Sequence, residues 1–182
     1  MTKTGYPIGT ALLVMIAAVA SGAQHATSRP RATGSVPLLY SSDLFHPHDD
    51  PDDHFDLATL FAISEFDLRG VVLDLGDRQA ERPGRIPLRQ MTHIAGRTVP
   101  FATGLARKLS SPTDKGLDQP ASDQGGVELI LNVLRDSPEP ITIFQTGSLR
   151  DLAAALNREP ELLQAKSLSQ NACSAERDPR AG

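Results

Sequence analysis

The sequence predicts an α/β fold, in which a mostly parallel sheet is flanked by helices, on three observations. Short apolar, β-branched runs alternate with helical patterns along most of the chain, as in a parallel sheet covered by helices. An acidic cluster directly follows the first apolar run, at the carboxyl end of a predicted strand, where open α/β sheets bind ligands. The 40% hydrophobic content in 182 residues is enough for one core of ordinary size.

The first elements are predicted from apolar runs and their periodicity. Residues 37–42 (Pro-Leu-Leu-Tyr-Ser-Ser) are expected to form a strand that ends at Asp43. The helix expected at 52–64 is apolar over most of its circumference, which indicates burial against the sheet. Residues 68–73 end in Val-Val-Leu and are predicted to form the next strand.

The second half continues the alternation, with a helix expected at 86–95 and a short strand at 98–101. The helix expected at 125–136 has apolar residues at i, i+3, i+4 and i+7, which indicates a core-facing stripe. A Pro-Glu-Pro turn ends this helix. The last three predicted elements are a strand at 141–144 and helices at 149–157 and 161–166.

The two ends of the chain differ from this domain, which we assign to residues 36–166. Residues 1–23 have the pattern of a secretory signal peptide, because Lys3 precedes an apolar stretch and small residues follow it. We therefore expect an exported protein, periplasmic or extracellular, that meets a membrane only through an uncleaved signal. Residues 24–35 are predicted to be a linker, and the polar residues 167–182 a disordered tail.

The composition excludes some function classes. A formal net charge of −4 and 4% aromatic residues supply neither a basic surface nor stacking platforms, so nucleic acid is not an expected partner. Cys173 is the one cysteine of the chain, so it cannot form an internal disulfide.

The acidic cluster, residues 46–54 (His-Pro-His-Asp-Asp-Pro-Asp-Asp-His), holds four carboxylates within five residues. Such charges repel one another unless a cation lies among them. Capping of the following helix accounts for Asp50, Asp52 and Asp53, since carboxylates are favoured at a helix N-terminus. It does not account for Asp49 or for Asp43. We therefore predict a site for a hard cation such as Ca²⁺, which takes about 6–8 oxygen ligands.

A zinc site is the alternative. His46, His48 and Asp50 have the His-x-His-x-Asp spacing of the metallo-β-lactamase-like zinc hydrolases, in which a further His follows directly. Here Pro51 stands at that position, and the later histidines are His54 and His93.

The segment from Val36 to about Lys166 resembles the N-terminal half of the inosine-uridine-preferring nucleoside hydrolases. Their signature is an apolar strand ending in Asp-x-Asp, a short turn, and Asp-Asp opening an apolar helix. The matching parts are Leu38 to Asp43 for the strand, Asp52-Asp53 for the helix start, Gly76-Asp77 where the family has Gly-Asn, and residues 144–153 for the family's Thr-Gly-x-Leu-Thr-Asn-Leu-Ala segment.

The resemblance implies hydrolysis of the N-glycosidic bond of a small-molecule ribonucleoside. It implies a Ca²⁺ ion, held by carboxylates of the acidic loop and by the carbonyl of Thr146, that binds ribose hydroxyls and a water. Asp43 is the best match for the general base, which Asp49 or Asp50 would replace if the loop folds differently. Asp77 is expected to bind substrate, to add to the metal shell or to cap a turn. The expected metal ligands are Asp49, Asp50, Asp52, Asp53 and Thr146, with His46 and His48 as the zinc alternative.

The sequence departs from the family pattern in several places. Ser41 replaces the first aspartate of Asp-x-Asp, and Asp77 and Asp151 replace asparagines. The family's remaining metal-binding aspartate and its leaving-group histidine have no counterpart, so we expect either a truncated form or a divergent member, with the activity of this chain alone left open. Uncovered sheet edges would then need partners or a homo-oligomer. A non-catalytic exported module that binds metal and ribose is the third reading.

Overall fold

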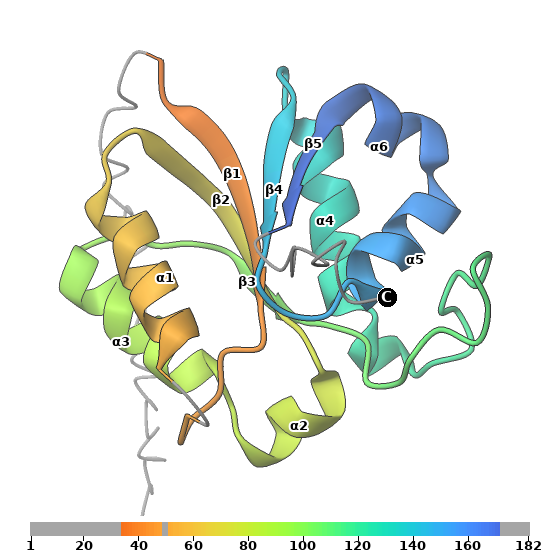
Figure 1. Ribbon diagram of the computed structural model, residues 1–182, viewed down its shortest axis with the longest axis horizontal. Coiled ribbons are helices and arrows are strands. Elements are labelled where there is room, and N and C mark those ends of the chain that lie inside the picture. Colours follow the sequence, from red (N-terminus) through yellow and green to blue (C-terminus); the bar gives the residue numbers. More distant parts are fainter. Residues whose placement is uncertain (1–33, 49–50, 172–182) are drawn as a thin grey trace, which may run out of the picture.

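A computed structural model describes residues 34–48 and 51–171. Five strands form one sheet in the order β3-β2-β1-β4-β5, and every neighbouring pair is parallel (Figure 1). This confirms the predicted α/β class. The strands are β1 (Val36–Ser42), β2 (Phe66–Leu73), β3 (Phe101–Thr103), β4 (Ile141–Gln145) and β5 (Ser167–Asn171).

Helices cover both faces of the sheet, with α1 and α3 on one side and α4, α5 and α6 on the other (Figure 1). Each layer encloses its own apolar cluster, because successive side chains of a strand point to opposite faces. Leu39 and Ile143 lie in the cluster under α4, whereas Leu38 and Tyr40 lie in the one under α1. The helices are α1 (Asp52–Ala62), α2 (Gly76–Glu81), α3 (Arg85–Ala95), the 3-10 turn η1 (Ala121–Asp123), α4 (Gly125–Asp136), α5 (Arg150–Arg158) and α6 (Pro160–Lys166).

The direction in which strands are added to the sheet reverses at β1, and this reversal determines where a ligand site is expected. The chain runs from β1 outward to β2 and β3, then returns to place β4 and β5 on the other side of β1. The loops that follow β1 and β4 therefore emerge next to each other, at the switch point where parallel sheets of this kind bind ligands. A backbone hydrogen bond of 3.0 Å from Thr146 N to Ser41 O joins the loop after β4 to the end of β1.

Most predicted elements are found, with three differences. The strand expected at 98–101 lies at Phe101–Thr103, because Pro100 has no N–H to donate and only its carbonyl joins the sheet, accepting from Val71 N at 2.9 Å. Helix α2 was not predicted. The expectation of a disordered tail is wrong for residues 167–171, which form β5 and pair with β4 along the whole strand.

The predicted signal peptide at 1–23, the linker up to residue 33 and the tail from residue 172 lie outside the described residues. Within the described part of the chain, no helix is both long and apolar enough to cross a membrane.

Candidate functional site

A pocket of about 350 Å³ opens at the carboxyl edge of the sheet, where the loops after β1 and β4 meet the start of α1. Its lining is mostly polar and includes four residues that the sequence singles out, Asp43, Asp52, Asp53 and Thr146. Asp43, Asp52 and Asp53 are close in sequence, whereas Thr146 lies 93 residues after Asp53. The complete lining is Asp43, Phe45, Asp52, Asp53, His54, Arg78 and Thr146.

Asp53 is the most firmly held of these carboxylates. It lies in the first turn of α1 and is buried. Its Oδ1 accepts hydrogen bonds from Thr146 Oγ1 at 2.7 Å, from Ser42 Oγ at 2.8 Å and from Tyr40 Oη at 3.2 Å. Three donors on one oxygen satisfy the buried charge and fix the orientation of the carboxylate.

Asp43 lies beside Asp53 at the end of β1. Burial, the charge of Asp53 and a hydrogen bond with Asp53 together raise the pKa of the Asp43 carboxyl to about 6. Burial and the neighbouring His48 lower the pKa of His54, another residue of the lining, which favours the neutral imidazole. The pocket thus combines two adjacent carboxyl groups with an uncharged histidine.

Sequence reasoning missed Asp74, which directly follows β2. It is fully buried, its Oδ2 accepts a hydrogen bond from Ser148 N, and its Oδ1 has no hydrogen-bond partner among the described residues. Burial and then the charge of Asp43 raise its pKa to about 8. Gly147 permits this packing, because a Cβ there would lie 2.2 Å from Asp74 Oδ2 and 2.8 Å from Asp43 N. The signal in the sequence was a carboxylate immediately after a buried strand.

Other predicted residues do not reach the pocket. His46 and His48 are exposed and absent from the lining, although the His48 ring lies edge-on to that of His54 with centroids 5.4 Å apart. Asp77 is exposed in the first turn of α2 and is also absent from the lining. Asp49 and Asp50 lie outside the described residues.

The lining offers donors of two kinds to a metal ion. Asp43, Asp52, Asp53 and Thr146 offer oxygen atoms, and His54 offers an imidazole nitrogen. Across residues 34–48 and 51–171, no three His, Cys, Asp or Glu side chains are grouped so as to hold a metal ion by themselves. A cation in this pocket would therefore also draw on backbone, water or substrate oxygens.

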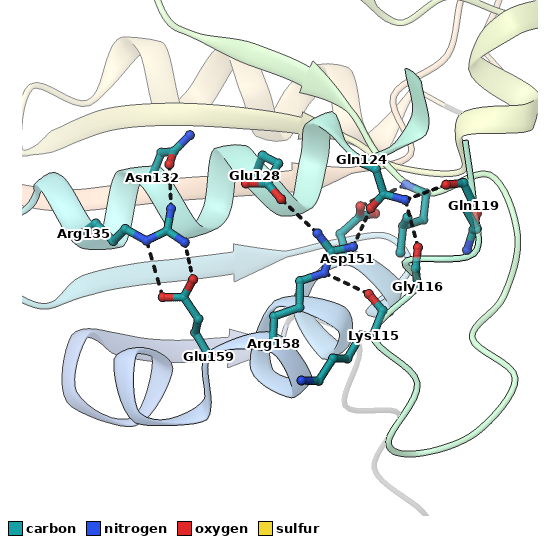
Figure 2. A network of polar contacts seen from close by, with 11 residues as sticks. Lys115, Gly116, Gln119, Gln124, Glu128, Asn132, Arg135, Asp151, Arg158 and Glu159 are labelled. Atoms are coloured by element: carbon teal, nitrogen blue, oxygen red, sulfur yellow. Dashed lines mark hydrogen bonds and ion pairs between the residues drawn. The ribbon is translucent and has the colours of Figure 1, made fainter. Parts of the chain in front are cut away.

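A second polar network lies away from the pocket, around Arg158 of α5 (Figure 2). Arg158 bonds to Glu128 of α4 at 3.0 Å and to the carbonyl of Lys115 at 2.9 Å, and it also donates to Gln124. Asp151, drawn in the same figure, is fully buried and accepts a hydrogen bond from Leu105 N at 2.9 Å. This network ties the loop between β3 and η1 to the helices, so its role is structural.

Comparison with known proteins points to one family. The family described as inosine-uridine preferring nucleoside hydrolase matches residues 48–169, more than half of the chain. The pyrimidine-specific ribonucleoside hydrolase RihA of Citrobacter koseri is 29% identical over 144 residues, which cover 70% of this chain and 45% of that protein. RihA of Salmonella newport is 30% identical with the same coverage. The chain spans about half the length of the curated relatives that it matches.

Proposed function

The chain belongs to the inosine-uridine preferring nucleoside hydrolase family, and from this premise we propose that it serves the hydrolysis of the N-glycosidic bond of a ribonucleoside with the help of Ca²⁺. The observation that carries the proposal is the convergence of Asp43, Asp53 and Thr146 on one pocket at the switch point of the sheet. Each of these residues matches a position of the family signature.

The residues of the pocket supply the ligands that this chemistry needs. Asp52, Asp53 and the carbonyl of Thr146 would hold Ca²⁺, joined by Asp49 and Asp50 of the acidic loop. When bound, the ion would neutralise the clustered carboxylates and stabilise negative charge near the reacting sugar. The three hydroxyl groups around Asp53 Oδ1 keep that carboxylate in one orientation before any ligand arrives.

Asp43 is proposed as the general base. Its carboxyl group lines the pocket beside Asp53, so it would face a water that enters the pocket with the substrate. As the water oxygen bonds to the anomeric carbon, the N-glycosidic bond breaks and its electron pair leaves with the nucleobase. Asp43 takes the proton that the water loses, and the departing nucleobase takes a proton from solvent. Asp77 is retained as a substrate contact only if the substrate extends beyond the pocket toward α2.

Two features of the substrate and the setting complete the proposal. The relatives are named as pyrimidine-specific, so uridine and cytidine are the first substrates to test. The signal-peptide pattern at residues 1–23 supports export, which mass spectrometry of the secreted chain would test through cleavage near residue 23.

The test measures release of uracil from uridine by the full chain in millimolar Ca²⁺ and in a chelator. We expect turnover that needs Ca²⁺ and that Asp43→Asn abolishes, while the exposed Asp136→Asn at the end of α4 leaves it unchanged. Calcium-dependent binding of ribose without turnover would support the non-catalytic module instead. If the chain neither binds ribose nor turns over uridine, the proposal is refuted.

A further inference from the structure

The loop that carries Asp43 is held by residues 76–84, a segment in which the proposed function assigns no role to Gln79. Gln79 of α2 is at its centre and is only 4% exposed. Its Nε2 donates to Leu44 O at 2.9 Å and to Asp74 O at 3.2 Å, and its Oε1 accepts from Gly84 N at 2.8 Å. One buried amide therefore joins the ends of β1 and β2.

These bonds complete a fixed path to the site. Leu44 N donates to Ser42 Oγ at 3.1 Å, and Ser42 Oγ donates to Asp53 Oδ1 at 2.8 Å. Both backbone groups of Leu44 are thus held. Its N–H bonds to the Ser42 hydroxyl, which in turn bonds to Asp53, and its carbonyl accepts from Gln79. Because Asp43 directly precedes Leu44, the direction of the Asp43 side chain depends on these anchors.

The remaining contacts of segment 76–84 act on the same loop. A Cβ on Gly84 would lie 2.1 Å from Leu44 O, so only glycine allows this close approach. The guanidinium groups of Arg78 and Arg82 lie 4.4 and 5.5 Å from the centroid of the Phe45 ring. Arg82 also donates to Pro47 O. The segment therefore braces the loop from Leu44 to Pro47.

We propose that Gln79 is a positioning residue that sets the place of Asp43 for general-base chemistry. The proposal rests on the proposed function for its kinetic consequence, but the bracing is a property of the fold alone. A displacement of about 1 Å in a catalytic group can lower a rate about 100-fold, so the loss of this amide has a measurable effect.

The chain supplies a matched control in Gln119, a second buried glutamine. It is 6% exposed, its Oε1 accepts from Arg107 N at 2.8 Å, and its Nε2 donates to Arg107 O at 3.0 Å. It braces a loop in the same way, but that loop carries no residue of the pocket. Gln79→Met and Gln119→Met each remove one such brace while keeping a similar side-chain volume.

The experiment compares both variants in the full chain with uridine and Ca²⁺. We expect Gln79→Met to lower kcat about tenfold or more with KM changed less than about twofold, and Gln119→Met to keep both values within about twofold. Both variants should lower Tm. An unchanged kcat in Gln79→Met, or an equal loss in Gln119→Met, would overturn the proposal.

A second readout does not depend on turnover. Gln79→Met should speed hydrogen exchange at the amides of Leu44 and Gly84, and leave the amide of Arg107 unchanged. If the wild-type chain shows no turnover, the proposed function fails by itself, and faster exchange at Leu44 still supports the brace. Unchanged exchange at both amides would refute the brace whatever the activity.

Discussion

Replacing the buried Asp151 with asparagine should stabilise the protein in a strongly pH-dependent way. The side chain is fully buried at the start of α5, and its Oδ2 has no hydrogen-bond partner among the described residues. Burial raises the pKa of its carboxyl from 3.8 to about 6. Asparagine has nearly the same shape and its Oδ1 can still accept from Leu105 N, but it carries no charge at any pH.

The magnitude follows from the two pKa values. The unfolded chain loses this proton near pH 3.8 and the folded chain near pH 6, so the folded state binds the proton more tightly. Above pH 6 the ionised carboxylate therefore lowers the free energy of unfolding by about 3 kcal/mol, at about 1.4 kcal/mol per pKa unit, whereas below pH 3.8 this penalty is absent. Asp151→Asn should gain that amount at neutral pH relative to acid.

Urea unfolding of wild type and variant at about pH 4 and about pH 7.5 measures this difference. Any change in packing caused by the amide is the same at both pH values and cancels. Asp114→Asn is an opposite control, because hydrogen bonds from Ser110 and Gly116 lower the pKa of Asp114 to about 2, so the variant should lose stability as pH rises. An equal effect of Asp151→Asn at both pH values would refute the reasoning.

Three further predictions concern the pocket. Millimolar Ca²⁺ should raise Tm, and the double variant Asp52→Asn with Asp53→Asn should abolish the shift; a shift that survives would place the ion elsewhere. The double variant His46→Ala with His48→Ala should keep the Tm shift caused by Ca²⁺. If the wild-type chain instead retains Zn²⁺ after dialysis and this variant does not, the zinc alternative is favoured. Gly147→Ala should lower the free energy of unfolding by about 1–3 kcal/mol, because the new methyl would lie 2.2 Å from a buried carboxylate oxygen. Denaturant unfolding measures this loss, and an unchanged free energy of unfolding would contradict the prediction.

Periodicity was enough to predict most of the fold. The apolar stripe at 127–134 marked α4, and the apolar run before Asp43 marked β1, because burial imposes a repeat on the residues that face the core. Helix α2 and strand β5 have no such repeat. Polar residues fill α2 apart from one glycine and one alanine, and β5 takes its stability from the backbone ladder with β4.

The site was predictable where local chemistry marked it and not where tertiary contacts decide it. Asp43 directly follows an apolar strand and Asp53 stands in the acidic cluster, and both line the pocket. Asp74 is one aspartate among many in the sequence, and only folding brings it against the loop at Ser148. The role of Gln79 was equally hidden, because its partner Leu44 lies 35 residues earlier in the chain.

The central position of β1 has a consequence for how the protein folds. On one edge of β1, Val36 pairs with Phe66 of β2, which is near in sequence. On the other edge, Leu38 pairs with Thr142 of β4, which is far away in sequence. Contacts so distant in sequence form slowly, and until they form, the most buried strand presents an open edge to other chains. Since Asp53 and Thr146 are 93 residues apart, a ligand that needs both can bind only after this closure. Ligand present during refolding should therefore select the closed sheet over aggregated chains.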